Sequence, residues 1–431
     1  MEAGRLARMG SVFSLLVAVV ACSSAATPGP TVVTSGTGTE TPSAVPTAGP
    51  SAALTVSPTA SPTASPHPMA PATLKPGPAM TQARRGQAAV RLGDGRVLMV
   101  GGTVAFTGKC AMACMEPATA SVEIFDPSTA KFSRNGSLAE PRTDGRALLL
   151  NDGRVLVSGG NGQYGDDLRT LEVYDPARGR SVVVRPPADI DKLPGNPAIV
   201  LLTDGKVLIV GGSTDDFTTS SNATIIFDPA SGAFSKGPLL ADSREGAMAT
   251  LLYDERVLVV GGYHYVGGYG YANTTAELID LSQPSSHSTS SVQQDPATST
   301  RLYDGRVLVA GGGPTDSRSA CASPVLSEAF DPKTEKFTAV APMATPRSGP
   351  AAIKIEDGRV LFMGGKDSNC DQVGTIEAFD PGSGTFQVVA TGFPKLSDFS
   401  STLLNDGEIL VAGGDSGDWN GMTAASWFIR P

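Results

Sequence analysis

The stretch that decides the fold is DGRVLMVGG, residues 94–102, because it recurs six more times along the chain. The other copies are DGRVLVSGG (152–160), DGKVLIVGG (204–212), DERVLVVGG (254–262), DGRVLVAGG (304–312), DGRVLFMGG (357–365) and DGEILVAGG (406–414). Successive copies start 49 to 58 residues apart. A period of this length is typical of arrays and propellers built from one repeated supersecondary unit.

Each copy predicts four antiparallel strands. Asp-Gly before a β-branched apolar run is a hairpin turn signal, and the run itself is apolar on both faces, as in a strand covered on both sides. A variable loop and a third strand ending in Asp-Pro follow the Gly-Gly, in VEIFDP (122–127), LEVYDP (171–176), IIFDP (225–229), EAFDP (328–332) and EAFDP (377–381). In four copies an aromatic residue opens the fourth strand: Phe132, Phe234, Phe337 and Phe386.

Such units leave both faces apolar, so they are stable only when stacked on like neighbours, and radial stacking closes the array. The pattern resembles the kelch repeat of β-propellers, in which Gly-Gly ends the second strand, Glu-x-Tyr-Asp-Pro marks the third and an aromatic marks the fourth. The resemblance covers residues 71–431. It implies an all-β, seven-bladed kelch-type β-propeller with four antiparallel strands per blade, similar to the central domain of galactose oxidase.

The two ends of the repeat region predict how the ring closes. The last copy stops after its third strand, residues 425–430, while ATLKPGPAM (72–80) precedes the first copy as AFSKGPLL (233–240) precedes the fourth. We therefore expect residues near 72–76 to supply the missing outer strand of the seventh blade. This pairing would remove an exposed sheet edge.

Composition agrees with this reading and excludes several classes of protein. The chain has 50 Gly and 33 Pro among 431 residues, which favours short strands and tight turns over long helices. Its mean hydropathy of -0.01 excludes a polytopic membrane protein. Its net charge of -9 disfavours a nucleic-acid partner, which needs a basic footprint. We expect a monomer.

Residues 1–21 read as an export signal, with Arg5 and Arg8 before a short apolar stretch. It ends in Val-Val-Ala-Cys22, which resembles the lipobox of bacterial lipoproteins, where the cysteine is acylated; the alternative is a plain cleaved signal with an incidental cysteine. Residues 22–70 are rich in Pro, Thr, Ser and Ala and predict a disordered stalk. The mature protein is then expected on the outer face of the bacterial cell membrane, attached only through its lipid anchor.

Charged residues recur inside the repeat. An arginine lies ten residues before the repeat's Asp in four copies, at Arg84, Arg142, Arg244 and Arg347. The third strand carries Glu123, Glu172, Glu277, Glu328 and Glu377. Arginine and glutamate occur together in copies one, two, four and six and are both absent from copies three and seven, while copy five, with Glu328 and Gln294, is the sole mismatch. This covariation predicts partly buried structural ion pairs, with room for the arginine left by the Gly-Gly, rather than catalytic groups.

The cysteines beyond Cys22 are even in number, as expected of a disulfide framework in an exported domain. All follow a Gly-Gly in the loops, and we predict that Cys110 pairs with Cys114 and Cys321 with Cys370. Metal binding by these cysteines is the lesser reading, because no histidine lies near them in sequence and their spacing matches no zinc pattern. We expect no metal site and no cofactor.

The loops after the Gly-Gly are where a propeller of this kind commonly binds its ligand. The fourth loop concentrates Tyr263, His264, Tyr265, Tyr269 and Tyr271, and Trp419 lies in the seventh. Aromatic rings with polar tips suit recognition of a glycan or a protein partner. The alternative is that these rings pack over the rim of their blade.

The resemblance also raises the question of an enzyme, because galactose oxidase uses copper held by two histidines and two tyrosines. Tyr263-His264 is similar to its adjacent Tyr-His pair, but the only other histidine beyond the stalk is His287, expected on an outer strand. A sugar epimerase of the exported kelch type is a further alternative. No complete catalytic set is present, so we expect a protein- or glycan-binding module and no enzyme.

Overall fold

The structure is a computed structural model, and it describes residues 69–105, 116–163, 165–188, 190, 192–215, 219–266, 269–289, 296–312, 327–417 and 421–431. The chain divides into the units Met1–Ser61 and Pro62–Pro431, and only the second contains described residues. The predictions for the signal, Cys22, the stalk up to residue 68, Cys110, Cys114, Cys321 and Trp419 lie outside them. Within the described part, no helix is long and apolar enough to cross a membrane.

In the described part of the chain the regular elements are strands, and they form seven four-stranded units that match the seven repeats. Blades one to three consist of β2 (Ala88–Arg91), β3 (Val97–Val100), β4 (Ser121–Asp126) and β5 (Lys131–Ser137); β6 (Arg146–Leu149), β7 (Val155–Ser158), β8 (Leu171–Asp175) and β9 (Arg180–Val184); and β10 (Ala198–Leu201), β11 (Val207–Val210), β14 (Thr224–Phe227) and β15 (Phe234–Lys236).

Blades four to six consist of β16 (Met248–Leu251), β17 (Val257–Val260), β20 (Ala276–Ile279) and β21 (His287–Ser288); β22 (Pro296–Arg301), β23 (Val307–Gly312), β24 (Ser327–Asp331) and β25 (Lys336–Val340); and β26 (Ala351–Lys354), β27 (Val360–Met363), β28 (Thr375–Asp380) and β29 (Thr385–Thr391). Blade seven consists of β30 (Ser400–Leu403), β31 (Ile409–Ala412), β32 (Ser426–Arg430) and β1 (Thr73–Pro76). Two short hairpins project from blades three and four: β12 (Ser213–Asp215) with β13 (Thr219–Ser220), and β18 (Tyr263–Val266) with β19 (Tyr269–Ala272).

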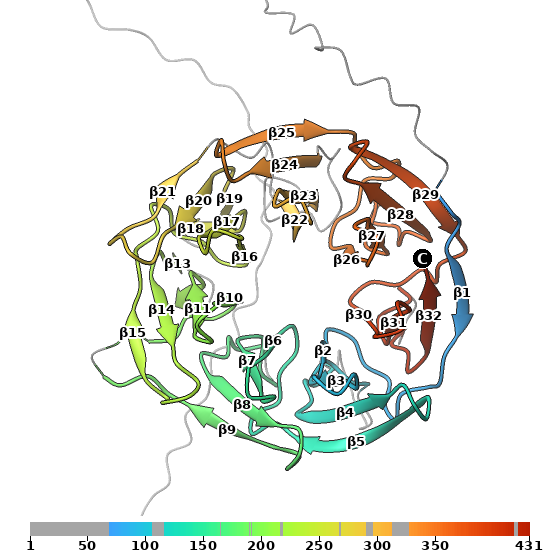
Figure 1. Cartoon of the computed structure of the whole chain (residues 1–431). Coiled ribbons are helices and arrows are strands. Elements are labelled where there is room, and N and C mark those ends of the chain that lie inside the picture. Colours follow the sequence, from blue (N-terminus) through green and yellow to red (C-terminus); the bar gives the residue numbers. More distant parts are fainter. Residues whose placement is uncertain are drawn as a thin grey trace, which may run out of the picture. The chain divides into compact units, whose positions relative to one another are not determined.

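The blades form a closed ring (Figure 1). Each innermost strand contacts the innermost strand of the next blade, in the order β2, β6, β10, β16, β22, β26 and β30, and β30 contacts β2 again. The predicted closure is confirmed, because β1 pairs antiparallel with β32 and sets Leu74 opposite Ile429. The N-terminal strand therefore completes the seventh blade.

The hydrophobic core lies between neighbouring blades, because the second strand of each blade is buried on both faces. Leu98 of β3 belongs to one cluster with Val155 of blade two, whereas the adjacent Met99 belongs to another with Leu410 of blade seven. Successive side chains of a strand point to opposite faces of the sheet. This alternation explains why the run is apolar in every copy, with Ser158 of blade two as the exception.

One feature was not expected from the repeats. Blades one and two join into a continuous eight-stranded sheet, because β5 and β9 meet through one parallel pair, Ser137 with Arg180. Gly136 lies at this junction with φ 85°, and a Cβ there would lie 1.8 Å from the carbonyl oxygen of Gly179. Only glycine allows the two outer strands to approach so closely.

Candidate functional site

The structure brings the four predicted arginines together with their glutamates. The Nη2–Oε1 distances are 2.6 Å for Arg84–Glu123, 2.5 Å for Arg142–Glu172, 2.7 Å for Arg244–Glu277 and 2.8 Å for Arg347–Glu377, and every one of these side chains is at most 1% exposed. The glutamates also accept backbone N–H groups from the preceding loop, such as Thr81 N to Glu123 at 2.7 Å. Burial lowers the pKa of Arg84 and Arg347, and the partner carboxylates oppose this shift. Each ion pair holds a loop against its own blade. The arginine and glutamate of a pair point toward one another, as expected of structural groups.

The role of the Gly-Gly differs from the one expected. The first glycine does accept the arginine of its own blade, as in Arg84 Nη1 to Gly101 O at 2.8 Å. The pair mainly serves the next blade, however, since Gly102 N donates to the carbonyl oxygen of Arg142 at 2.8 Å. A Cβ on Gly101 would lie 2.4 Å from that same oxygen. The missing side chains therefore make room for the neighbouring backbone.

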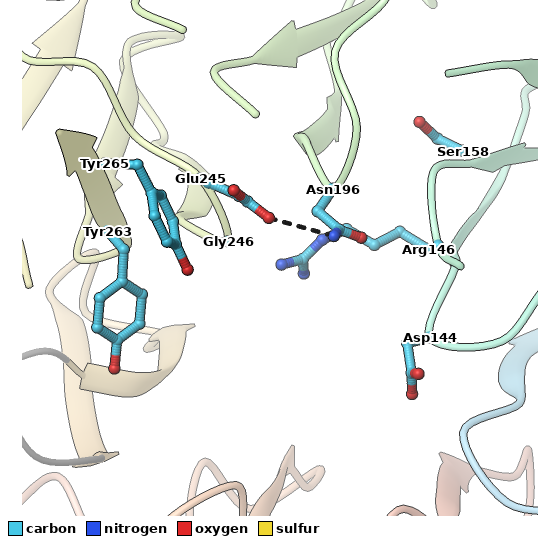
Figure 2. Close-up of a pocket in the computed structure, with 9 residues that line it drawn as sticks. Asp144, Arg146, Ser158, Asn196, Glu245, Gly246, Tyr263 and Tyr265 are labelled. Atoms are coloured by element: carbon cyan, nitrogen blue, oxygen red, sulfur yellow. Dashed lines mark hydrogen bonds between the residues drawn. The ribbon is translucent and has the colours of Figure 1, made fainter. Parts of the chain in front are cut away.

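The tyrosine-rich loop of blade four forms the hairpin β18–β19. Its register sets Tyr263 opposite Ala272 and His264 opposite Tyr271, and Tyr269 pairs with Val266 at the hairpin end. His264 stacks on Tyr271 at 5.4 Å between ring centroids, and its Nδ1 lies 3.3 Å from Asn273 Oδ1. Tyr263 and Tyr265 line a pocket instead (Figure 2). The loop thus divides its aromatic residues between packing and a concave surface.

This pocket, which we call the inner pocket, lies at the inner edges of blades two, three and four. Its volume is about 190 Å³, which is smaller than the sites that enclose drug-sized ligands. Its walls combine charged, amide, hydroxyl and aromatic groups. They are Asp144, Arg146, Ser158, Gly160, Asn196, Glu245, Gly246, Tyr263 and Tyr265.

Two of these side chains occupy a backbone position that favours glycine. Asp144 has φ 57° and Asn196 has φ 44°, while the equivalent residues of blades one and four are Gly86 at φ 63° and Gly246 at φ 69°. Asp and Asn tolerate the left-handed region better than other residues with a Cβ. Blades two and three therefore carry a polar side chain where blades one and four have glycine.

Glu245 is the most enclosed acid of the inner pocket. Its side chain is 7% exposed; Oε1 accepts from Asn196 Nδ2 at 3.3 Å, and no hydrogen-bond partner for Oε2 is found among the described residues. Burial raises the pKa of this carboxyl, the charge of Asp167 adds to the rise, and the Asn196 hydrogen bond and Arg169 oppose it. Burial also raises the pKa of the neighbouring Tyr265 hydroxyl.

Asp144 is a second carboxyl with a raised pKa. Its side chain is accessible to water, yet the surrounding protein desolvates it, and the charge of Asp398 adds to the rise. The hydrogen bond from Thr143 and the charge of Arg85 act in the opposite direction. Carboxyls with raised pKa values in a concave site are common at functional sites.

Comparison with known proteins places the fold. No family model matches the chain, and no curated protein matches it. Among solved structures, a fungal alcohol oxidase of the AA5 family, determined in complex with copper, matches with a TM-score of 0.61 and 15% identity over 83% of this chain and 76% of that chain. The chain has the kelch β-propeller fold. At this identity the likeness shows the fold alone.

The residues of this propeller do not fit a copper centre of two histidines and two tyrosines. His287 lies on β21, the outermost strand of blade four, where its Nε2 lies 3.1 Å from Glu335 Oε2. The chain's third histidine, His67, is outside the described ranges. Within those ranges, no three His, Cys, Asp or Glu side chains gather where they could hold a metal. We derive no copper chemistry.

Sequence reasoning missed most of the inner pocket. Tyr263 and Tyr265 were predicted, but Asp144, Arg146 and Asn196 were not. They come from different repeats, so no local motif joins them. The usable signal is a departure from the repeat, such as Asp144 standing where other copies have glycine. Cys370 is disulfide-bonded, and the predicted pairings remain predictions because the other cysteines are outside the described residues.

Proposed function

We propose that this chain is an exported binding protein whose propeller takes up a carbohydrate in the inner pocket and leaves it chemically unchanged. Attachment to the outer face of the membrane through Cys22 is part of the proposal and rests on the lipobox-like sequence and the stalk composition. The acidic net charge of -9 argues against a nucleic-acid ligand.

The main support for the proposal is that two tyrosines line one pocket together with hydrogen-bond donors and acceptors. Tyr263 and Tyr265 come from β18, Asn196 from blade three and Asp144 from blade two, all facing one pocket (Figure 2). Sugar rings present apolar C–H faces and many hydroxyls, so they suit aromatic rings beside fixed polar groups. The unpartnered Oε2 of buried Glu245 is an acceptor that a ligand hydroxyl would satisfy.

A second candidate is a carbohydrate-active enzyme of the epimerase type. One observation favours it: Asp144 and Glu245 are two carboxyls with raised pKa values in one pocket. Carboxyls in a binding pocket can serve as proton donors and acceptors in catalysis. The binding function and the enzyme predict the same ligand contacts and differ in the fate of the ligand.

The test is a glycan array with the purified full-length chain, followed by calorimetry on the best ligand. Tyr265→Ala should weaken binding about tenfold, because the ring and its hydroxyl are lost together. The matched control is Tyr303→Ala, an exposed tyrosine in the turn between β22 and β23, which should leave affinity unchanged.

The fate of the ligand separates the two candidates. After prolonged incubation, the NMR spectrum of the recovered sugar should be that of the starting material. A new epimer or anomer formed by the wild type and not by Glu245→Gln would establish the enzyme. Failure of every glycan on the array to bind would refute the proposed function.

A further inference from the structure

We infer that the inner pocket selects sugars that carry a carboxylate, of the uronic acid class, and that Arg146 binds this carboxylate. The inference rests on the proposed carbohydrate-binding function and names its ligand class. It is carried by three observations on Arg146: its departure from the repeat, its lack of a carboxylate partner, and the groups that surround it.

Arg146 departs from the repeat in a way that folding does not require. It is the first residue of β6 and faces Ser158 across the strand pair. In the other blades the equivalent residue is uncharged, namely Ala88, Ala198, Met248, Thr298, Ala351 and Ser400. The residues opposite these are apolar, namely Val100, Val210, Val260, Ala310, Met363 and Ala412.

Six blades therefore form the same strand pair without the charge, and with an apolar residue where blade two has Ser158. In a repeat protein, what all units share is what the fold needs. A residue that departs from the repeat pattern in a single unit is expected at a functional site. Blade two carries a double change, because Ser158 is smaller than most of its equivalents and leaves space beside the arginine.

Among the described residues, the guanidinium of Arg146 has no carboxylate partner. Its one hydrogen bond runs from Nη2 to the carbonyl oxygen of Ala247 in blade four, at 3.4 Å. No carboxylate of the described residues lies within the 4.0 Å of an ion pair, although Asp144 and Glu245 line the same pocket. Surrounding protein lowers the pKa of the guanidinium by desolvation, even though water reaches the side chain.

The structural arginines of this protein show the contrast. Arg84, Arg142, Arg244 and Arg347 each lie within 2.8 Å of a glutamate oxygen. Arg146, by contrast, is exposed, so its guanidinium can meet a ligand carboxylate that enters from solvent. A planar guanidinium matches the two oxygens of a carboxylate in a bidentate contact.

The neighbours of Arg146 favour an acidic sugar over a free inorganic anion. The carboxyls of Asp144 and Glu245 would repel a compact dianion such as phosphate, but they accept hydrogen bonds from sugar hydroxyls. Asn196 and Ser158 add neutral donors and acceptors on the same wall. One carboxylate with several hydroxyls on one ring meets all of these groups.

The test compares an oligogalacturonide with the same oligosaccharide after methyl esterification, by calorimetry on the full-length chain. Wild type should bind the acid at least tenfold more tightly than the ester, as loss of a charged hydrogen bond implies. Arg146→Ala restores the residue found at the equivalent position in blades one, three and six, so it should fold. It should bind acid and ester equally.

Two further measurements separate a binding role from a structural one. Arg146→Met, the residue of blade four, should behave like Arg146→Ala, whereas Arg178→Ala should keep the preference for the acid. Arg178 is an exposed arginine of the same blade that pairs with Asp175. An Arg146→Ala protein that unfolds at the wild-type temperature shows that the loss of preference is not a loss of fold.

Equal affinity of the wild type for acid and ester would overturn the inference and leave the proposed function standing. An acid preference that survives Arg146→Ala would overturn the assignment to this residue. If wild type binds neither these sugars nor any other glycan, the proposed function fails and the inference fails with it.

Discussion

Arg154 of blade two donates from Nη2 to the carbonyl oxygen of Pro229 in blade three, at 2.8 Å. The same contact recurs from Arg256 to Pro332 at 2.8 Å and from Arg306 to Pro381 at 3.0 Å. The arginine belongs to the Asp-Gly-Arg turn, which is Asp-Glu-Arg in blade four, and the proline belongs to the Asp-Pro turn. The two strongest motifs of the repeat are thus two halves of one contact between neighbouring blades.

Removing this contact should destabilise the ring. In Arg306→Met the interblade hydrogen bond from a charged donor is lost, and the unfolding free energy should fall by about 1.5 kcal/mol or more. The matched control is Lys206→Met, the equivalent residue of blade three, whose Nζ forms its hydrogen bond with the exposed Asp204 of its own turn, at 2.6 Å. That loss should be under about 1 kcal/mol. Urea denaturation midpoints measure both, and equal losses would contradict the interblade role.

The fold was predictable because every blade repeats its requirements. Gly-Gly, Asp-Gly and the apolar run are demanded by turns and by burial that all seven units share, and the joint loss of Arg and Glu from copies three and seven revealed the buried pairs. The inner pocket depends on what the blades do not share. Asp144, Asn196 and Glu245 lie about 50 residues apart in sequence, and only the curvature of the ring brings them together.

The buried ion pairs should show strong coupling. Glu377→Ser leaves Arg347 buried without its partner and should cost about 3–5 kcal/mol. The double variant Arg347→Leu, Glu377→Ser removes both buried charges together; in blade seven the equivalent positions hold Leu396 and, by the strand register, Trp427. It should lose less than the single Glu377→Ser variant.

A double-mutant cycle by chemical denaturation measures that coupling. The N–H groups of Ala344 and Thr345 lose their glutamate acceptor in both variants, so their contribution cancels in the comparison. Additive losses would mean that arginine and glutamate act independently.

Closure by the N-terminal strand predicts the effect of truncation. Deleting residues 69–77 removes β1, exposes the edge of β32 and takes Leu74 from its core cluster. We expect a lower melting temperature and aggregation on heating. Deleting residues 23–61, which the composition predicts to lack a core, should leave the melting temperature unchanged. Scanning calorimetry measures the melting temperature, and light scattering measures aggregation. If neither changes in the Δ69–77 protein, the ring does not depend on its N-terminal strand.

The cysteines predict a specific peptide map. Under non-reducing conditions, proteolysis of the exported protein should yield one peptide joining Cys321 to Cys370 and one in which Cys110 is bonded to Cys114, identified by mass spectrometry. Cys370 is already disulfide-bonded in the structure. Replacing Cys321 with serine should leave Cys370 reactive toward a thiol reagent, and a Cys370 that stays blocked in this variant would reveal a different partner.

Glu245 should make stability depend on pH in a defined direction. Burial raises the pKa of its carboxyl above the ordinary 4.5, so the folded protein holds the proton more tightly than the unfolded chain does. Its stabilising effect is complete below that ordinary value and is lost as the pH rises through the folded-state pKa. Glu245→Gln cannot titrate and keeps an acceptor for Asn196. The melting temperature of the variant minus that of the wild type should therefore increase between about pH 4.5 and pH 7, whereas a constant difference would show that the carboxyl titrates alike in both states.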